Sequence, residues 1–215
     1  MARPRTPLLN RALIRDTALA MIDEHGLAGL TMRRLAERLG VQAPSLYSHY
    51  PTKEHVLDAI ADLLTDRVDT SGFATDWRTG LVTWARSYHA ALAAHPNAVP
   101  VVASGTGRRE RYLAMADAVH GGLVGAGWPA RYATMIAGSV KYLVIGAAST
   151  PFASGFADDI QVYLDRYPNL TQAHRLREHA EEIDADSFEL GLAALVRGLE
   201  ADYARVGSPR RRTPA

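Results

Sequence analysis

The sequence predicts an all-α fold, in which an N-terminal three-helix unit with a helix-turn-helix precedes a C-terminal helical bundle. Apolar residues recur every three or four positions along nearly the whole chain, which is the spacing that buries one face of a helix. No segment shows the strict alternation of apolar and polar residues that a half-buried strand needs. A run of small and polar residues, DTSGFATD at 69–76, separates the two parts.

The composition is that of a globular protein without disulfide or thiolate chemistry. Of the 215 residues 47% are apolar and 22% are charged, which is enough apolar material for a real core. There is no cysteine, which excludes disulfides and cysteine-ligated zinc and fits a reducing cytoplasm. The N-terminus is basic but lacks the apolar run of a signal peptide, and we expect no membrane span.

Periodicity and capping signals give the expected elements. Gly26 ends a first helix, and Thr31 and Gly40 begin and close a second. Further helices are expected at 43–50, 52–66, 77–94, 108–125, 129–148 and 187–205, with a looser segment from about 149 to 184. We therefore expect one domain at 1–66, a second at 67–207 and a basic, disordered tail at 208–215.

The second and third helices are joined by residues 40–43 alone, which is the tight connection of a helix-turn-helix. Leu35, Val41, Leu46 and Tyr50 are expected to hold the pair against the first helix, so polar and aromatic side chains of the third helix point outward. A short helix with such a face is poorly stabilised alone, but its placement fits entry into the major groove of DNA. The expected cations beside the phosphate backbone are Arg33, Arg34 and Lys53.

The stretch GLAGLTMRRLAERLGVQAPSLYSHYPTKEHVLDAI resembles the DNA-binding region of TetR-family transcriptional repressors, and the resemblance covers residues 9–65. It implies a three-helix DNA-binding unit whose fourth helix leads to a body that binds a small molecule and dimerises. It also implies a homodimeric repressor that binds a palindromic operator and releases it when the small molecule enters the body. The operator contacts implied are Arg33, Gln42, Ala43, Pro44, Ser45, Tyr47, Ser48, His49 and Lys53, of which Ala43 offers only apolar contact. The basic segment ARPRTP at 2–7 is either a minor-groove arm or a frayed end.

The helices expected at 129–148 and 187–205 carry apolar or small residues on more than one face, which indicates two packing partners for each helix. The resemblance implies that one partner is the same pair of helices in a second copy, and a monomeric bundle that buries both faces is the alternative. The expected dimer contacts are Ile136, Val140, Leu143, Gly191, Ala194, Leu195 and Gly198.

The body is weakly similar to that of tetracycline repressors, but the metal-chelating positions differ. Ala103 stands where a histidine is expected before GT, and Asp69 and Thr150 replace two further ligands. We therefore expect no metal and no cofactor, and an apolar or aromatic effector instead. The candidate pocket residues are Trp84, Tyr88, His89, Tyr112, Met115, His120, Trp128, Tyr142 and Phe152.

Signals for catalysis are weak. The segment GTGRRE lacks a third glycine and follows no strand, and no nucleophile with a neighbouring base is visible. Two function classes stay open: a ligand-responsive regulator, and an all-helical small-molecule carrier or enzyme with an incidental helix-turn-helix. The exposed tyrosine and histidine of the third helix, together with Lys53, favour the regulator.

Overall fold

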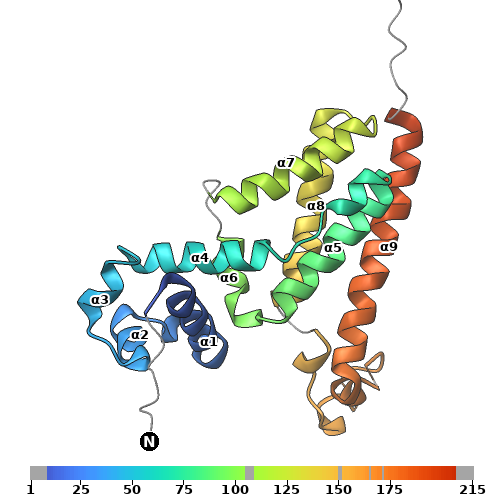
Figure 1. The fold of residues 1–215 in the computed structure, drawn as a ribbon. Coiled ribbons are helices and arrows are strands. Elements are labelled where there is room, and N and C mark those ends of the chain that lie inside the picture. Colours follow the sequence, from blue (N-terminus) through green and yellow to red (C-terminus); the bar gives the residue numbers. More distant parts are fainter. Residues whose placement is uncertain (1–8, 105–108, 150–151, 165, 171, 207–215) are drawn as a thin grey trace, which may run out of the picture.

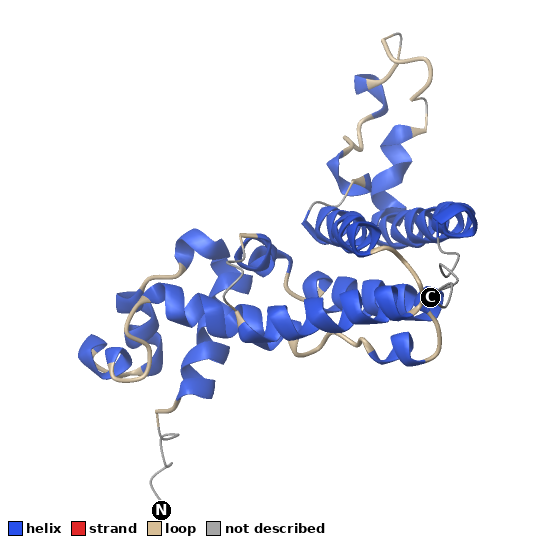
Figure 2. Cartoon of the chain, turned by 90° about the horizontal axis from the view of Figure 1, so that it is seen from above, coloured by secondary structure: helices blue, strands red, loops and turns tan. Residues whose placement is uncertain are grey.

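The computed structural model describes residues 9–104, 109–149, 152–164, 166–170 and 172–206 (Figure 1). Within these ranges the chain forms helices and turns and no strand (Figure 2), so the expectation of an all-α fold is confirmed. No helix in the described part of the chain is long and apolar enough to cross a membrane. The expected basic arm at 2–7, Thr150 and the tail at 208–215 lie outside the described residues.

The N-terminal unit consists of α1 (Arg11–Gly29), α2 (Met32–Leu39) and α3 (Ala43–Tyr47), and α4 (Lys53–Thr65) leads from it to the body (Figure 1). Gly26, where the first helix was expected to end, interrupts α1 with a φ of 69°, in the region that favours glycine, and a short helical turn follows to Gly29. Thr52 stands at the expected N-cap of α4, but its hydroxyl pairs with His55 Nδ1 at 3.0 Å rather than with a backbone N–H.

The body is a bundle in which α5 (Trp77–Ala93), α8 (Ala130–Ser149) and α9 (Ala180–Val206) pack against one another and α7 (Glu110–Gly125) packs across α8 (Figure 1). Short elements complete it: the 3-10 turns η1 (Ser71–Ala74) and η2 (Pro96–Ala98), the helix α6 (Val99–Ala103), and three further 3-10 turns, η3 (Ala153–Gly155), η4 (Ile160–Val162) and η5 (Ala173–His179). The core runs from the N-terminal unit through α4 into the bundle without a break.

The last helix begins seven residues earlier than expected. Its first part, AEEIDAD at 180–186, carries few apolar residues, so the sequence shows no helical stripe there. Glu181 and Glu182 lie in the first turn, where carboxylates interact favourably with the helix dipole.

Polar contacts join the N-terminal unit to the body at η2. His95 Nδ1 lies 2.8 Å from Asp23 Oδ2 of α1, and Asn97 Nδ2 donates to the Asp23 carbonyl at 2.9 Å. His95 Nε2 lies 3.3 Å from Arg67 Nη1, just beyond α4. The orientation of α1 on the body is therefore fixed by directional contacts as well as by apolar packing.

The small-residue break at 69–76 is a packed turn, because Phe73 of η1 inserts between α5 and α7 at Gly80 and Gly122. A Cβ added at Gly122 would stand 2.5 Å from Phe73 Cδ1, so the ring would have to move.

We expect Gly122→Ala to lower the free energy of unfolding by about 1–3 kcal/mol, the usual cost of overpacking, in a urea titration. The neighbouring Gly121 has open space around it, so Gly121→Ala should raise stability by about 0.5–1 kcal/mol. Equal effects of the two substitutions would contradict this packing.

Candidate DNA-binding face and ligand pocket

Backbone and capping bonds define the turn between α2 and α3. Thr31 Oγ1 accepts from Arg34 N at 3.2 Å and caps α2, as expected. Gly40 ends α2 in the left-handed conformation, with φ 68°, and Val41 N donates to the Ala36 carbonyl at 3.0 Å. A residue with a Cβ is disfavoured at Gly40, so the glycine fixes the angle at which α3 leaves.

The third helix is a single turn and is held by its neighbours. Leu46 is fully buried and Tyr50 is nearly so, while the Tyr50 hydroxyl donates to the Arg11 carbonyl at 3.1 Å. Arg11 Nη1 donates in return to the His49 carbonyl at 2.7 Å, and its guanidinium lies 4.3 Å from the centre of the Tyr50 ring. These contacts with α1 replace the stability that so short a helix lacks by itself.

The outward side of α3 is a contiguous polar and aromatic surface, which we call the α3 face. Tyr47 is 49% exposed and makes no hydrogen bond within the described residues. Ser48 Oγ donates to the Ser45 carbonyl at 2.9 Å, which leaves the lone pairs of the hydroxyl oxygen toward solvent. The α3 face comprises Gln42, Pro44, Ser45, Tyr47 and Ser48, all exposed, with Ala43 and His49 half-buried at its edges.

Three cations flank the α3 face, and each has a contact within the chain. Arg33 Nε lies 3.0 Å from Glu37 Oε1, and Arg34 Nη1 donates to the Gly29 carbonyl at 3.3 Å. Lys53 is half-buried at the start of α4, with Nζ 3.5 Å from the Leu27 carbonyl. Such long or solvent-exposed contacts are weak, so these cations can be recruited by a phosphate.

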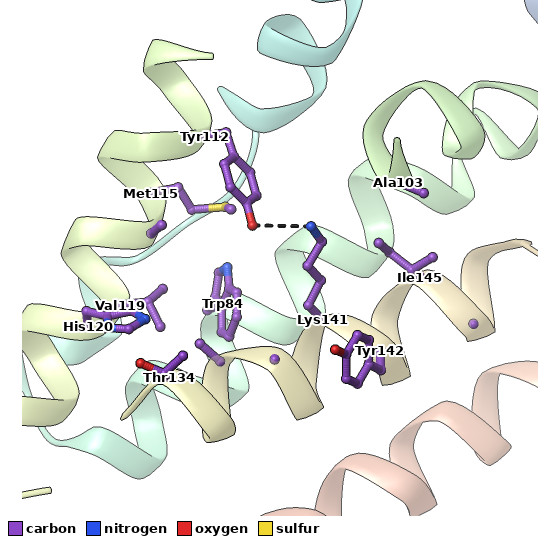
Figure 3. Close-up of a pocket in the computed structure, with 14 residues that line it drawn as sticks. Trp84, Ala103, Tyr112, Met115, Val119, His120, Thr134, Lys141, Tyr142 and Ile145 are labelled. Carbon is purple, nitrogen blue, oxygen red and sulfur yellow. Dashed lines mark hydrogen bonds between the residues drawn. The ribbon is translucent and has the colours of Figure 1, made fainter. Parts of the chain in front are cut away.

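A cavity of about 660 Å³ lies between α5, α7 and α8 (Figure 3). Its walls are mostly apolar, with few polar groups, and the volume is in the range of small-molecule sites. Five of the nine expected pocket residues line it: Trp84, Tyr112, Met115, His120 and Tyr142. Ala103, the residue at the expected chelating position, is also part of the wall.

The other four expected residues lie elsewhere, so their assignment to this cavity is corrected. Tyr88 is completely buried in the core, and this burial raises the pKa of its hydroxyl. The ring of His89 stacks on Phe188 of α9 at 4.0 Å, and burial lowers the pKa of its imidazole. Trp128 packs edge-on against Trp77 at 5.3 Å. Phe152 is 67% exposed beyond the end of α8.

Sequence reasoning missed the most polar residue of the cavity. Lys141 of α8 reaches into it and donates to the Tyr112 hydroxyl at 3.2 Å (Figure 3). The signal was present, because Lys141 is the only charged residue between 132 and 149, in an otherwise apolar helix. Thr134, Gly138 and Ile145 line the cavity from the same helix.

Acidic side chains of α4 connect the cavity wall to the DNA-binding unit. Arg109, at the start of α7, donates to Asp58 Oδ1 at 2.7 Å and to the Val101 carbonyl at 2.9 Å. One turn along α4, Asp62 Oδ1 is buried without a partner among the described residues; burial raises the pKa of this carboxyl, and the nearby Arg109 opposes the shift. Arg111 Nε lies 3.1 Å from Asp66 Oδ1. The helix that carries Tyr112 and Met115 is thus joined to α4 by ion pairs.

The expected dimer residues divide into buried and outward groups. Ile136 and Val140 are buried in the core of the single chain, so they are not available to a second copy, and this expectation is corrected. Periodicity alone does not tell which apolar face of a helix turns inward. The exposed sides of α8 and α9 carry large apolar residues instead, with Met135 53%, Tyr142 77% and Leu190 69% exposed.

The remaining expected dimer residues lie on or near that outward side. Ala194 and Gly198 are exposed on α9, while Leu143, Gly191 and Leu195 are half-buried. A Cβ at Gly191 would stand 3.1 Å from Leu143 Cδ1, so these two residues already pack α8 on α9 within one chain.

Comparison with known proteins matches both parts of this arrangement. Residues 14–60 match the model of the tetR family of bacterial regulatory proteins, and residues 73–203 match the tetracyclin repressor-like C-terminal domain. The chain belongs to the TetR family. The expectations of a TetR-family DNA-binding regulator, with an N-terminal helix-turn-helix and a helical C-terminal domain, are confirmed.

Several relatives of this TetR-family chain match it over nearly their whole length. The class C tetracycline repressor protein of Escherichia coli is 34% identical over 201 residues, which cover 89% of this chain and 91% of the relative. A TetR-family regulator structure from Streptomyces coelicolor A3(2) has a TM-score of 0.71 at 30% identity, covering 89% of this chain and 99% of that one. A minocycline complex of the TetR-Q116A protein from Acinetobacter baumannii AYE has a TM-score of 0.67 at 26% identity, covering 94% and 99%.

Proposed function

We propose that this chain is a cytoplasmic repressor that binds a palindromic operator as a homodimer through its α3 faces and releases the operator when an effector enters the cavity. The observation that carries the proposal is the α3 face itself. Its outward side chains make few contacts within the chain, whereas Leu46 and Tyr50 hold the helix in place from behind. A helix presented in this way suits the major groove, in which base edges and phosphates accept hydrogen bonds.

In this proposal the operator is contacted by the α3 face with Ala43 and His49, and by the flanking Arg33, Arg34 and Lys53. The DNA-binding domain spans 1–66 and the effector-binding and dimerisation domain spans 67–207. One copy has too few base contacts for useful specificity, so two copies are required to read a site. The exposed apolar side chains of α8 and α9 support these helices as the surface between the copies.

Effector binding in the cavity acts on DNA through α4. The effector touches α7, Arg109 ties α7 to Asp58 of α4, and α4 carries the DNA-binding unit. Coupling requires that the effector bind one position of α4 more tightly than the other. A coupling free energy of about 1–3 kcal/mol, the usual range, would lower operator affinity about 5- to 150-fold.

The test begins with selection of bound sequences from a random duplex DNA pool, using the purified full chain. We expect an enriched palindrome, whose half-site spacing then defines a probe for an effector screen. A compound that binds in the cavity should lower affinity for this probe within the range given above. If no sequence is enriched at low salt by a folded dimer, the regulatory assignment is wrong and a helical carrier or enzyme becomes the better description.

A further inference from the structure

The cavity contains a cation without a counter-ion. Lys141 Nζ contacts the Tyr112 hydroxyl at 3.2 Å and lies 4.7 Å from the centre of the Tyr112 ring. Neither Asp nor Glu is among the residues that line the cavity, and Lys141 takes part in no ion pair within the described part of the chain. Placing a cation against apolar walls costs free energy unless an anion or several acceptors offset it.

Two further polar groups beside Lys141 can donate hydrogen bonds. The indole Nε1 of Trp84 is buried without a hydrogen-bond partner in the described structure. Figure 3 shows this nitrogen at the edge of the ring that is turned toward Tyr112 and Lys141. Because the Tyr112 oxygen accepts from Lys141, the hydroxyl proton of Tyr112 remains available for donation. Three donors with one positive charge thus converge on one part of the cavity.

Most of the remaining wall is apolar, apart from His120 and Thr134, and the cavity is large enough for fused rings. Met115, Val119 and Ile145 contribute hydrophobic surface, and a volume of about 660 Å³ exceeds that of a tricyclic molecule. Gly138 and Gly146 have no heavy atom within 4 Å of an added Cβ, so the α8 side of the cavity is open beside the rings.

We propose that the effector is a polycyclic aromatic carboxylate. Lys141 pairs with the carboxylate, Tyr112 and the Trp84 indole N–H donate to its oxygens or to a neighbouring carbonyl, and Met115, Val119 and Ile145 pack on the rings. The word effector rests on the proposed regulatory function, whereas the preference for an acid rests on the cavity alone. A neutral aromatic molecule would leave the Lys141 charge without a counter-ion.

The test compares anthraquinone-2-carboxylate with anthraquinone-2-carboxamide, which share rings and size but differ in charge. Binding of each to the full chain is measured by titration calorimetry without DNA. We expect the carboxylate to bind at least 10-fold more tightly than the amide. In Lys141→Met the affinity for the carboxylate should fall about 10- to 100-fold, to the level of the amide, while the affinity for the amide stays unchanged. Lys141→Arg, which keeps the charge, should keep the preference for the acid.

Thermal unfolding of each variant shows whether the fold is retained, and the arginine variant serves as the control for altered side-chain shape. The proposal is overturned if wild-type protein binds the amide as tightly as the acid, if Lys141→Met keeps the preference, or if neither compound binds at millimolar concentration. Release of operator DNA is measured separately. If the acid binds through Lys141 but operator affinity does not change, the ligand class stands and the proposed regulatory function fails. If a neutral compound releases the operator and the acid does not bind, the proposed function stands and the proposed ligand class fails.

Discussion

Replacing Tyr47 by alanine should weaken operator binding by about 30- to 1,000-fold while leaving the fold unchanged. The side chain is half-exposed on the α3 face and has no hydrogen-bond partner in the described residues, so its removal disturbs little within the chain. A side-chain contact to DNA of this kind contributes about 1–2 kcal/mol, and a dimer loses it twice. Operator affinity is measured by fluorescence anisotropy at fixed salt, because phosphate contacts make affinity depend strongly on ionic strength.

Leu46, the neighbour of Tyr47 on the same turn, provides the matched comparison. It is fully buried, so Leu46→Ala should lower the free energy of unfolding by about 2–5 kcal/mol, the range for deletions of this size in a core. Lys53→Ala should weaken binding to all DNA sequences alike and make it less sensitive to salt. If Tyr47→Ala melted at a lower temperature or lost the dimer, or if it bound the operator like wild type, the assignment of the α3 face would be wrong.

Replacing Arg109 by alanine should uncouple the effector from DNA. The Arg109 side chain is 9% exposed and links α7 to Asp58 of α4 and to the Val101 carbonyl of α6. Its removal leaves Asp58 without its ion-pair partner and takes from the half-buried Asp62 one of its two nearby cations. We expect a loss of about 1–3 kcal/mol of stability, below the value for a fully buried pair because Asp58 is 45% exposed. The ratio of operator affinities without and with effector should fall at least 5-fold.

The control is Arg111, two residues along the same helix. Its pair with Asp66 is exposed on both sides, so Arg111→Ala should change stability by less than about 0.5 kcal/mol and leave the affinity ratio nearly intact. Equal losses of coupling in the two variants would mean that the effector acts on α4 by another route. Effector affinity is measured for both variants without DNA, which separates a damaged cavity from a damaged connection.

The helix-turn-helix was predictable from sequence because its signals are local. Thr31, Gly40 and the buried Leu46 each act on residues within a few positions, so spacing alone fixed the turn and the inward side of α3. Most body helices followed from apolar periodicity for the same reason. The start of α9 was missed because its acidic first turns carry no apolar stripe, and helix α6, only five residues long, gave too short a pattern.

The cavity was only half predictable because its membership depends on how α5, α7 and α8 cross. The sequence does not distinguish Trp84 from Trp128, because both are large aromatic residues that are expected to be buried. In the structure Trp84 lines the cavity, whereas Trp128 packs on Trp77. The apolar spacing of α8 likewise does not tell whether the face with Ile136 or the face with Tyr142 turns toward the core. Residues 136 and 140 turn into the core, whereas Tyr142 lines the cavity and is 77% exposed, and only the packing of the neighbouring helices decides this.

The single turn of α3 divides its residues into those that hold the helix and those that face solvent. Leu46, Tyr50 and the Arg11 contacts fix its position, and none of them belongs to the outward surface. The exposed side chains can therefore be exchanged without repacking the domain. Transplanting the corresponding residues of another regulator onto this turn should redirect the protein to that regulator's DNA sequence while its response to effector stays the same, so target and signal are separable by design and by evolution.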